Sequence, residues 1–280
     1  MRYTSPTDLG EALEILAEHG EDAKVMAGGQ SLLLLLREHF VEPSLLVSLR
    51  GIEALRRLEV NGSAQISAMV THAEVERHPA IRERWPLLAR AEAAVSTVQV
   101  RNRGTLCGNI AHGYPTADPP AALIASDATV HLRSKRGGER QLPVESFFVG
   151  LLETAARWDE LVTGVSLPPQ PAGARWAYLK YALRPLDFAI VGVGVRLVLG
   201  EDGAVLEARI GLNGAANHTL RAAAAEKVLV GAKPKPELLQ EAGEAAARES
   251  DPLGDTDGSA EYKRRVIAVY TRRALQAALA

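Results

Sequence analysis

Two glycine-containing loops, about 75 residues apart, constrain this chain more than any other feature of its sequence. The first loop covers residues 27–32 and reads Ala-Gly-Gly-Gln-Ser-Leu. The second loop covers residues 101–109 and reads Arg-Asn-Arg-Gly-Thr-Leu-Cys-Gly-Asn. Glycine lets a backbone adopt positive φ and approach a ligand without a Cβ clash. Each loop therefore predicts a backbone shaped for a negatively charged ligand, and two such loops suggest a ligand with two phosphates.

The first loop has the sequence setting of a phosphate site. It follows a strand expected at residues 24–27 and precedes a helix expected at residues 32–37, which Ser31 is placed to cap. The N–H groups from Gly29 onward would then point outward at the helix start. An ordinary strand-turn-helix connection also favours Gly-Gly, so this motif alone leaves both readings open. Neither G-x-G-x-x-G nor G-x-x-x-x-G-K-[ST] is present, so a Rossmann or P-loop site has no support.

The second loop is richer in polar groups. Arginines and an asparagine precede Gly104, and Asp118 lies nine residues past Asn109. A carboxylate near a phosphate loop can accept hydrogen bonds from ribose hydroxyls, as in other dinucleotide sites. A polar surface loop with Arg103 paired to an acidic side chain would explain the same residues. Spacing alone therefore does not decide what the second loop does.

Composition excludes several classes of function. The 32 basic and 34 acidic residues give a formal net charge of −2 and are interspersed, which does not fit a nucleic-acid-binding surface. The only cysteine, Cys107, excludes an internal disulfide, an iron–sulfur cluster and a four-cysteine zinc site held by this chain alone. Residues 1–6 lack the apolar core of a signal peptide, and no apolar run has the length of a membrane span. We therefore expect a cytoplasmic protein.

The N-terminal part of the sequence predicts a small β-α-β unit. Apolar residues recur at helical spacing over residues 9–17, after Asp8 and before Gly20, which favours a capped helix. A buried strand is expected at residues 45–49. Together with the strand and helix around the first loop, these elements predict a first unit at residues 1–55.

The rest of the chain predicts two further units. Residues 58–68 read as a hairpin, and Thr71 with Glu74 has the pattern of a capping box. The stretch 170–173, Gln-Pro-Ala-Gly, is the best linker, and strand patterns follow it around a hairpin turn at residues 201–203. Other expected elements are helices at 86–94, 121–126, 221–229, 237–248 and 260–279, and strands at 128–132, 160–167, 174–182, 189–199 and 205–212. His72 and His112 stand alone and are expected to be ordinary polar residues.

Four motifs in this order closely resemble one known family. They are the first loop, the second loop with Ile110-Ala111, the run Pro115-Thr116-Ala117-Asp118-Pro119-Pro120, and the run Asp187-Phe188-Ala189-Ile190-Val191. Together they resemble the FAD-binding medium subunit of molybdenum hydroxylases, a family that includes aerobic carbon monoxide dehydrogenase and the xanthine dehydrogenases. The resemblance covers residues 3–280 and rests on four motifs at matching separations.

The resemblance implies an α+β fold of the vanillyl-alcohol-oxidase type. Two α+β subdomains, at residues 1–55 and 56–170, would enclose the flavin. A C-terminal α+β domain at residues 171–280 would carry a three-stranded antiparallel sheet and a helix bundle.

The resemblance also implies which residues bind FAD. Both loops would hold the pyrophosphate through backbone amides, Asp118 would contact a polar part of the cofactor, the Val162 backbone would lie near the adenine, and Lys180 would lie near the flavin end. The implied cofactor-binding residues are Ala27, Gly28, Gly29, Gln30, Ser31, Leu32, Thr105, Gly108, Asn109, Asp118, Val162 and Lys180. No catalytic side chain and no metal ligand is implied.

The implied function is electron transfer within an oxidoreductase. A small subunit with two [2Fe-2S] clusters would deliver electrons to FAD, a molybdopterin-bearing large subunit would hydroxylate the substrate, and NAD⁺, a quinone or O2 would accept the electrons. The implied assembly is a dimer of heterotrimers. Two alternatives stay open, namely a stand-alone flavoprotein oxidoreductase and a scaffold of the same fold without cofactor.

Cys107 is a departure from the family pattern. The second loop of the family reads T-I-G-G-N, and Cys107 replaces the first of those two glycines. If that position needs positive φ, a cysteine there is strained by about 1 kcal/mol or more. This expected strain is what keeps the scaffold alternative open.

Overall fold

The N-terminal part of the chain folds around a three-stranded parallel sheet in the computed structural model, which describes residues 1–280. Strands β1 (Arg2–Thr4) and β2 (Ala23–Met26) flank β3 (Leu45–Ser48), whose four residues are all buried. Asp8 caps helix α1 (Leu9–His19), since its carboxylate accepts from the N–H of Glu11. Helix α2 (Leu32–Arg37) connects β2 to β3, so the β-α-β unit is present as predicted.

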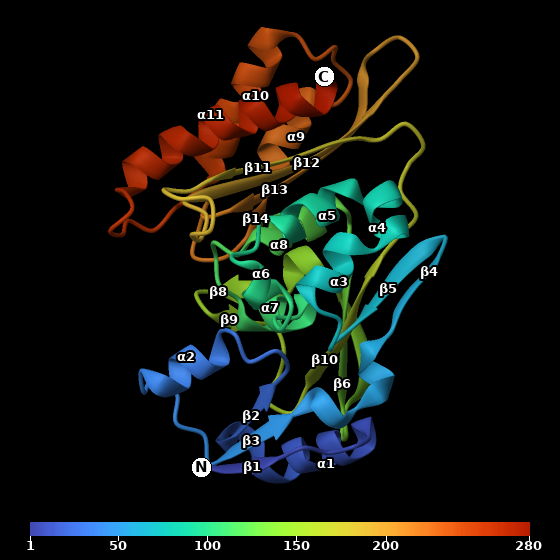
Figure 1. The fold of residues 1–280 in the computed structure, drawn as a ribbon. Helices are drawn as coiled ribbons and strands as arrows, with labels where there is room; N and C mark the ends of the chain where they lie inside the picture. Colours follow the sequence, from blue (N-terminus) through green and yellow to red (C-terminus); the bar gives the residue numbers. More distant parts are fainter.

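None of the residues of helix α2 is buried, whereas α1 buries Ala12, Leu13 and Leu16. Its leucines Leu33 and Leu34 are about half exposed, and Figure 1 shows α2 extending away from the body of the molecule. Ser31 precedes α2 with helical dihedral angles and makes no side-chain capping bond. The expected serine cap was therefore wrong, because a capping side chain needs an extended backbone at that position.

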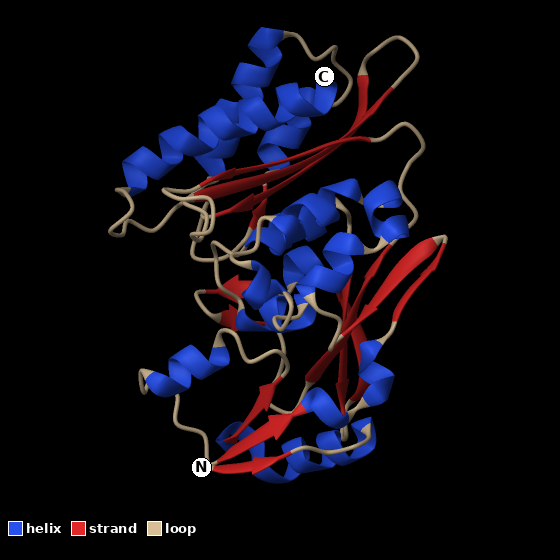
Figure 2. Ribbon diagram, viewed as in Figure 1, coloured by secondary structure: helices blue, strands red, loops and turns tan.

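The middle of the molecule is a five-stranded antiparallel sheet with helices on one face (Figure 2). Its strands, in spatial order, are β4 (Leu58–Asn61), β5 (Ser63–Ser67), β10 (Leu161–Leu167), β6 (Thr129–Ser134) and β7 (Gly138–Pro143). The helical layer consists of α3 (His72–Arg77), α4 (Pro79–Arg84), α5 (Pro86–Ala93), α6 (Val98–Arg101), α7 (Leu106–His112) and α8 (Asp118–Ala125). The predicted capping box at Thr71 and Glu74 starts α3 with both of its hydrogen bonds. A small hairpin of β8 (Phe148–Gly150) and β9 (Glu153–Thr154) completes this part.

The C-terminal part is an antiparallel sheet covered on one side by three helices (Figure 1). The sheet contains β11 (Arg175–Tyr181), β12 (Val191–Leu199), β13 (Val205–Asn213) and the two-residue β14 (Leu220–Arg221). The helices are α9 (Ala223–Leu229), α10 (Pro236–Glu249) and α11 (Ala260–Leu279). A separate core of 22 buried residues lies between them and the sheet. The α+β fold is therefore confirmed, with β14 added to the three expected strands.

Helix α8 joins the central and C-terminal parts at very short range. A Cβ on Gly211 of β13 would lie 2.2 Å from the carbonyl oxygen of Ala121, and one on Gly194 of β12 would lie 2.9 Å from the same atom. Glycine at these two positions thus lets the sheet backbone touch the helix backbone.

None of the helices combines the length and the apolar character that a membrane span requires.

Candidate functional site

The two glycine loops lie against each other. A Cβ on Gly28 would fall 2.0 Å from the carbonyl oxygen of Arg103 and 2.7 Å from the Cα of Gly104. On the other side of the contact, a Cβ on Gly108 would lie 3.6 Å from the Cβ of Ala27. Only glycine at position 28 permits this backbone-to-backbone approach. Two segments about 75 residues apart in the sequence thus form one surface.

The first loop presents a row of backbone donors. Gly29 has a positive φ of 74°, and the side chain of Gln30 donates to the carbonyl oxygen of Gly28. The N–H groups of Gly29, Gln30, Ser31 and Leu32 find no acceptor within the chain. Consecutive free N–H groups in a glycine turn suit an anionic ligand. The predicted geometry of the first loop is therefore present even though the serine cap is not.

The second loop leads directly into helix α7. Thr105 caps this helix, since its hydroxyl oxygen accepts from the N–H of Gly108 at 3.0 Å. The N–H of Asn109 donates to the carbonyl oxygen of Thr105, so both of these amides are used within the chain. The N–H of Cys107 has no acceptor, and Oδ1 of Asn109 is buried without a partner. The groups left for a ligand are therefore the amide of Cys107 and the side chain of Asn109.

Cys107 is not strained. It lies in the first turn of α7, is not among the residues with positive φ, and packs with Ile66 in the main core. Its Sγ lies 3.8 Å from the carbonyl oxygen of Ile66, and burial raises the pKa of the thiol well above its usual range. The expected strain was wrong, because this position is helical and accepts any ordinary side chain. The one sequence feature that favoured a cofactor-free scaffold is thereby removed.

Asp118 and Lys180 come together as a buried ion pair. The first residue of α8 is Asp118, and its Oδ2 lies 2.8 Å from Nζ of Lys180 on β11. Tyr178 donates its hydroxyl proton to Oδ1 at 2.6 Å, and Lys180 also donates to the carbonyl oxygen of Ala94 at 2.9 Å. Burial raises the pKa of the Asp118 carboxyl, and the charge of Lys180 opposes that rise. These two predicted residues therefore share one site, as partners of each other.

Val162 stands apart from that pair. It belongs to β10 in the middle of the five-stranded sheet, at a bulge between residues 162 and 164, and its side chain is part of the main core. Only its backbone is therefore free to face a ligand.

No cluster of three or more histidine, cysteine or acidic side chains in the structure is arranged to hold a metal ion.

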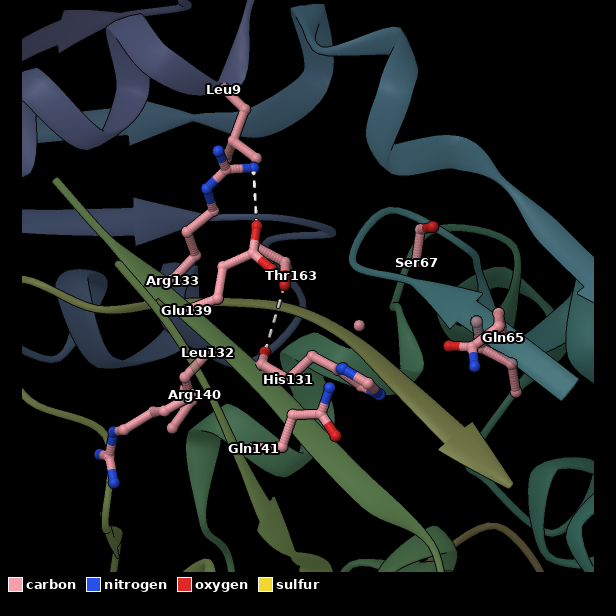
Figure 3. Close-up of a pocket in the computed structure, with 12 residues that line it drawn as sticks. Leu9, Gln65, Ser67, His131, Leu132, Arg133, Glu139, Arg140, Gln141 and Thr163 are labelled. Atoms are coloured by element: carbon pink, nitrogen blue, oxygen red, sulfur yellow. Dashed lines mark hydrogen bonds and ion pairs between the residues drawn. The ribbon is translucent and has the colours of Figure 1, made fainter. Parts of the chain in front are cut away.

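A polar cavity of about 210 Å³ lies beside the five-stranded sheet, and Figure 3 shows the residues that line it. Gln65, His131 and Arg133 line it together with Ile66 and Leu132, but Ile66 and Leu132 are buried in the main core. Since α7 packs in that core, the alternation of side chains along the strands puts the cavity and the glycine loops on opposite faces of the sheet. The cavity is therefore not part of the candidate site.

Comparison with known protein families identifies the family to which this chain belongs. The family described as the FAD binding domain in molybdopterin dehydrogenase matches residues 1–170. The CO dehydrogenase flavoprotein C-terminal domain matches residues 176–278. The chain belongs to the FAD-binding medium subunits of molybdenum hydroxylases. The predicted family and its FAD cofactor are confirmed, and the family consists of oxidoreductase subunits.

Individual medium subunits are similar over almost their whole length. The nicotine 6-hydroxylase medium subunit of Paenarthrobacter nicotinovorans is 35% identical over 276 residues, which cover 98% of this chain and 96% of that subunit. The carbon monoxide dehydrogenase medium chain of Hydrogenophaga pseudoflava is 36% identical and covers 99% and 96%. The structure of the latter enzyme superposes with a TM-score of 0.96, covering 100% of this chain and 97% of that chain. Quinoline 2-oxidoreductase from Pseudomonas putida 86 gives a TM-score of 0.92 at 32% identity, with 99% and 96% covered.

The residues at the paired loops fit the FAD of these medium subunits. The four unpaired N–H groups of the first loop and that of Cys107 are donors for an anionic group. The unpartnered Oδ1 of Asn109 is a buried acceptor without a protein donor, so a hydroxyl of a ligand would satisfy it. The sequence motif for the second loop did not single out the Cys107 amide, because its availability depends on where α7 begins.

Proposed function

We propose that this chain is the electron-transfer subunit of its molybdenum hydroxylase, taking electrons from [2Fe-2S] clusters on a small partner subunit and passing them to an external acceptor. NAD⁺, a quinone and O2 are the acceptor classes. The observation that carries the proposal is the contact between the two glycine loops at Gly28, which gathers unpaired backbone donors from both loops into one anion site. When bound there, FAD supplies the redox chemistry, and this chain supplies binding and orientation.

We further propose how the chain holds the cofactor. The residues 27–32 and the second-loop residues Thr105, Gly108 and Asn109 surround the pyrophosphate side, and the Val162 backbone faces the adenine. Both carboxylate oxygens of Asp118 already accept hydrogen bonds from Lys180 and Tyr178. Asp118 and Lys180 would therefore act on FAD as one neutral pair, not as two free charges. The division of the chain at residues 55 and 170 into two flavin subdomains and a C-terminal domain is part of the same proposal.

Exposed apolar side chains support a role inside a larger assembly. Leu33, Leu34 and Phe40 on and after α2 are between 50% and 77% exposed, and Leu183 and Phe188 after β11 are more than half exposed. Such side chains suit protein interfaces. We propose that the small subunit with two [2Fe-2S] clusters and a molybdopterin-bearing large subunit cover these surfaces, and that two heterotrimers form a dimer.

Electron delivery by the partner is the step to test. We expect the flavin absorbance of the loaded chain to bleach when the chain is mixed anaerobically with its dithionite-reduced [2Fe-2S] partner. The same flavin should stay oxidised when the oxidised [2Fe-2S] partner is added without dithionite, because no electrons are then available. Reduction of the flavin by NADH without the partner would assign NAD⁺ as the acceptor class, because hydride transfer between NADH and a flavin runs in both directions. Absence of bleaching by the reduced partner would contradict the proposed electron path.

A further inference from the structure

A buried histidine–glutamate pair lies directly behind the second loop. His72 is the first residue of α3 and Glu92 lies in the last turn of α5, and the two side chains are 4% and 0% exposed. Nδ1 of His72 lies 2.5 Å from Oε2 of Glu92. A carboxylate can only accept, so Nδ1 carries the proton and the ring orientation is fixed. His72 was expected to stand alone, and the structure instead pairs it with Glu92.

Both the backbone and the imidazole ring of His72 contact the second loop. The backbone N–H of His72 donates to the carbonyl oxygen of Gly104 at 2.9 Å, and the N–H of Leu106 donates to Val70 at 3.3 Å. A Cβ on Gly104 would lie 3.0 Å from Cδ2 and 3.3 Å from Nε2 of the imidazole. The ring of His72 therefore packs against the glycine of the second loop.

The contact continues to the first loop. Gly104 is one of the residues that a Cβ on Gly28 would strike, so the ring of His72, Gly104 and Gly28 lie one behind another. We propose that His72 is a positioning residue of the FAD site, held by Glu92 so that its ring sets where the second loop meets the first. This inference rests on the proposed function, because it assigns the two loops to FAD.

Stability alone does not account for the pair. Oε1 of Glu92 is buried without any hydrogen-bond partner, which costs free energy. A buried ion pair can be replaced by neutral side chains of similar volume with little loss of stability. If the pair were purely structural, FAD binding at the loops would not depend on it. If the pair positions the second loop, FAD binding depends on where the nitrogen that donates to Glu92 lies.

Two amide substitutions of His72 separate these roles. In His72→Asn the amide nitrogen stands near the place of Nδ1 and can still donate to Glu92, whereas in His72→Gln it reaches toward the place of Nε2. FAD is titrated into the flavin-stripped full chain, and the quenching of flavin fluorescence is followed. We expect the dissociation constant of His72→Asn to stay within about threefold of wild type and that of His72→Gln to rise about tenfold or more.

Controls keep the outcome specific. His131→Gln alters a histidine on the opposite face of the sheet, which bonds Ser166, and should leave FAD affinity unchanged. Melting temperatures of the flavin-free chains show whether each variant folds. If the His72 variants do not fold, Glu92→Gln, which keeps an acceptor, is compared with Glu92→Met, and only the latter should lose affinity.

Failure of this inference and failure of the proposed function look different. If the wild-type chain takes up no FAD, the proposed function itself falls. If the wild-type chain binds FAD but the Asn and Gln variants, or the Glu92 variants, bind it equally well, the positioning role is overturned. A tenfold gap within either pair of variants supports it.

Discussion

Gly28→Ala should weaken FAD binding by about a hundredfold, the largest effect of a single methyl group that we expect in this chain. The added Cβ would stand 2.0 Å from the carbonyl oxygen of Arg103 and 2.7 Å from the Cα of Gly104. Non-bonded carbon atoms need about 3.5 Å, so the loops must separate by on the order of 1 Å. Both obstructing atoms are backbone, and no side chain can rotate away to relieve the clash.

The measurement is the FAD dissociation constant of the flavin-stripped chain, with Gly254→Ala as the matched control. Gly254 is also a loop glycine without positive φ, and the nearest atom to its added Cβ would be 3.4 Å away, an ordinary contact. Gly254→Ala should bind FAD like wild type. Wild-type affinity in Gly28→Ala would show that the contact between the loops does not matter for the cofactor.

Breaking the Asp118–Lys180 pair should cost the most stability. Asp118→Leu removes the acceptor of both Lys180 and Tyr178 at a place where the side chains are at most 10% exposed. A buried ammonium left without its partner costs about 3–5 kcal/mol of unfolding free energy. The double variant Asp118→Leu with Lys180→Met carries no stranded charge and should recover much of that loss. Denaturant unfolding of the wild type, the single variants Asp118→Leu and Lys180→Met, and the double variant measures both the loss and the recovery.

An exposed ion pair gives the matched control for that cycle. Lys135 and Glu14 join distant segments in the same way, but their side chains are 52% and 55% exposed. Removing Glu14 should change the unfolding free energy by about 1 kcal/mol or less. If Asp118→Leu is as mild as that, or if the double variant is no more stable than the single one, the pair does not join α8 to the C-terminal sheet.

Elements with strong periodicity were predictable from the sequence. Helices α10 and α11 were expected at 237–248 and 260–279 and lie within one residue of those limits at each end. The capping box at Thr71 and the strand β10 were also found, because their signals are local. The family motifs added the fold and the cofactor, which periodicity alone does not specify.

What the sequence did not show depends on tertiary contacts. Helices α4, α6 and α7 are four to seven residues long, too short for a helical repeat to stand out. Cys107 was expected to be strained because a motif gives no dihedral angle, and its helical conformation follows from the cap at Thr105. The approach of Gly28 to Gly104 and the pairing of His72 with Glu92 join separate segments, so no local sequence pattern predicts them.

A crystal structure of the chain with FAD bound shows whether both glycine loops hold one pyrophosphate. We expect that pyrophosphate to lie within about 3 Å of unpaired N–H groups in both loops, from Gly29 to Leu32 and at Cys107. We also expect a hydroxyl of FAD to donate to Oδ1 of Asn109. A pyrophosphate that touches only one loop, or FAD bound in the cavity on the opposite face of the sheet, would contradict the proposed FAD site.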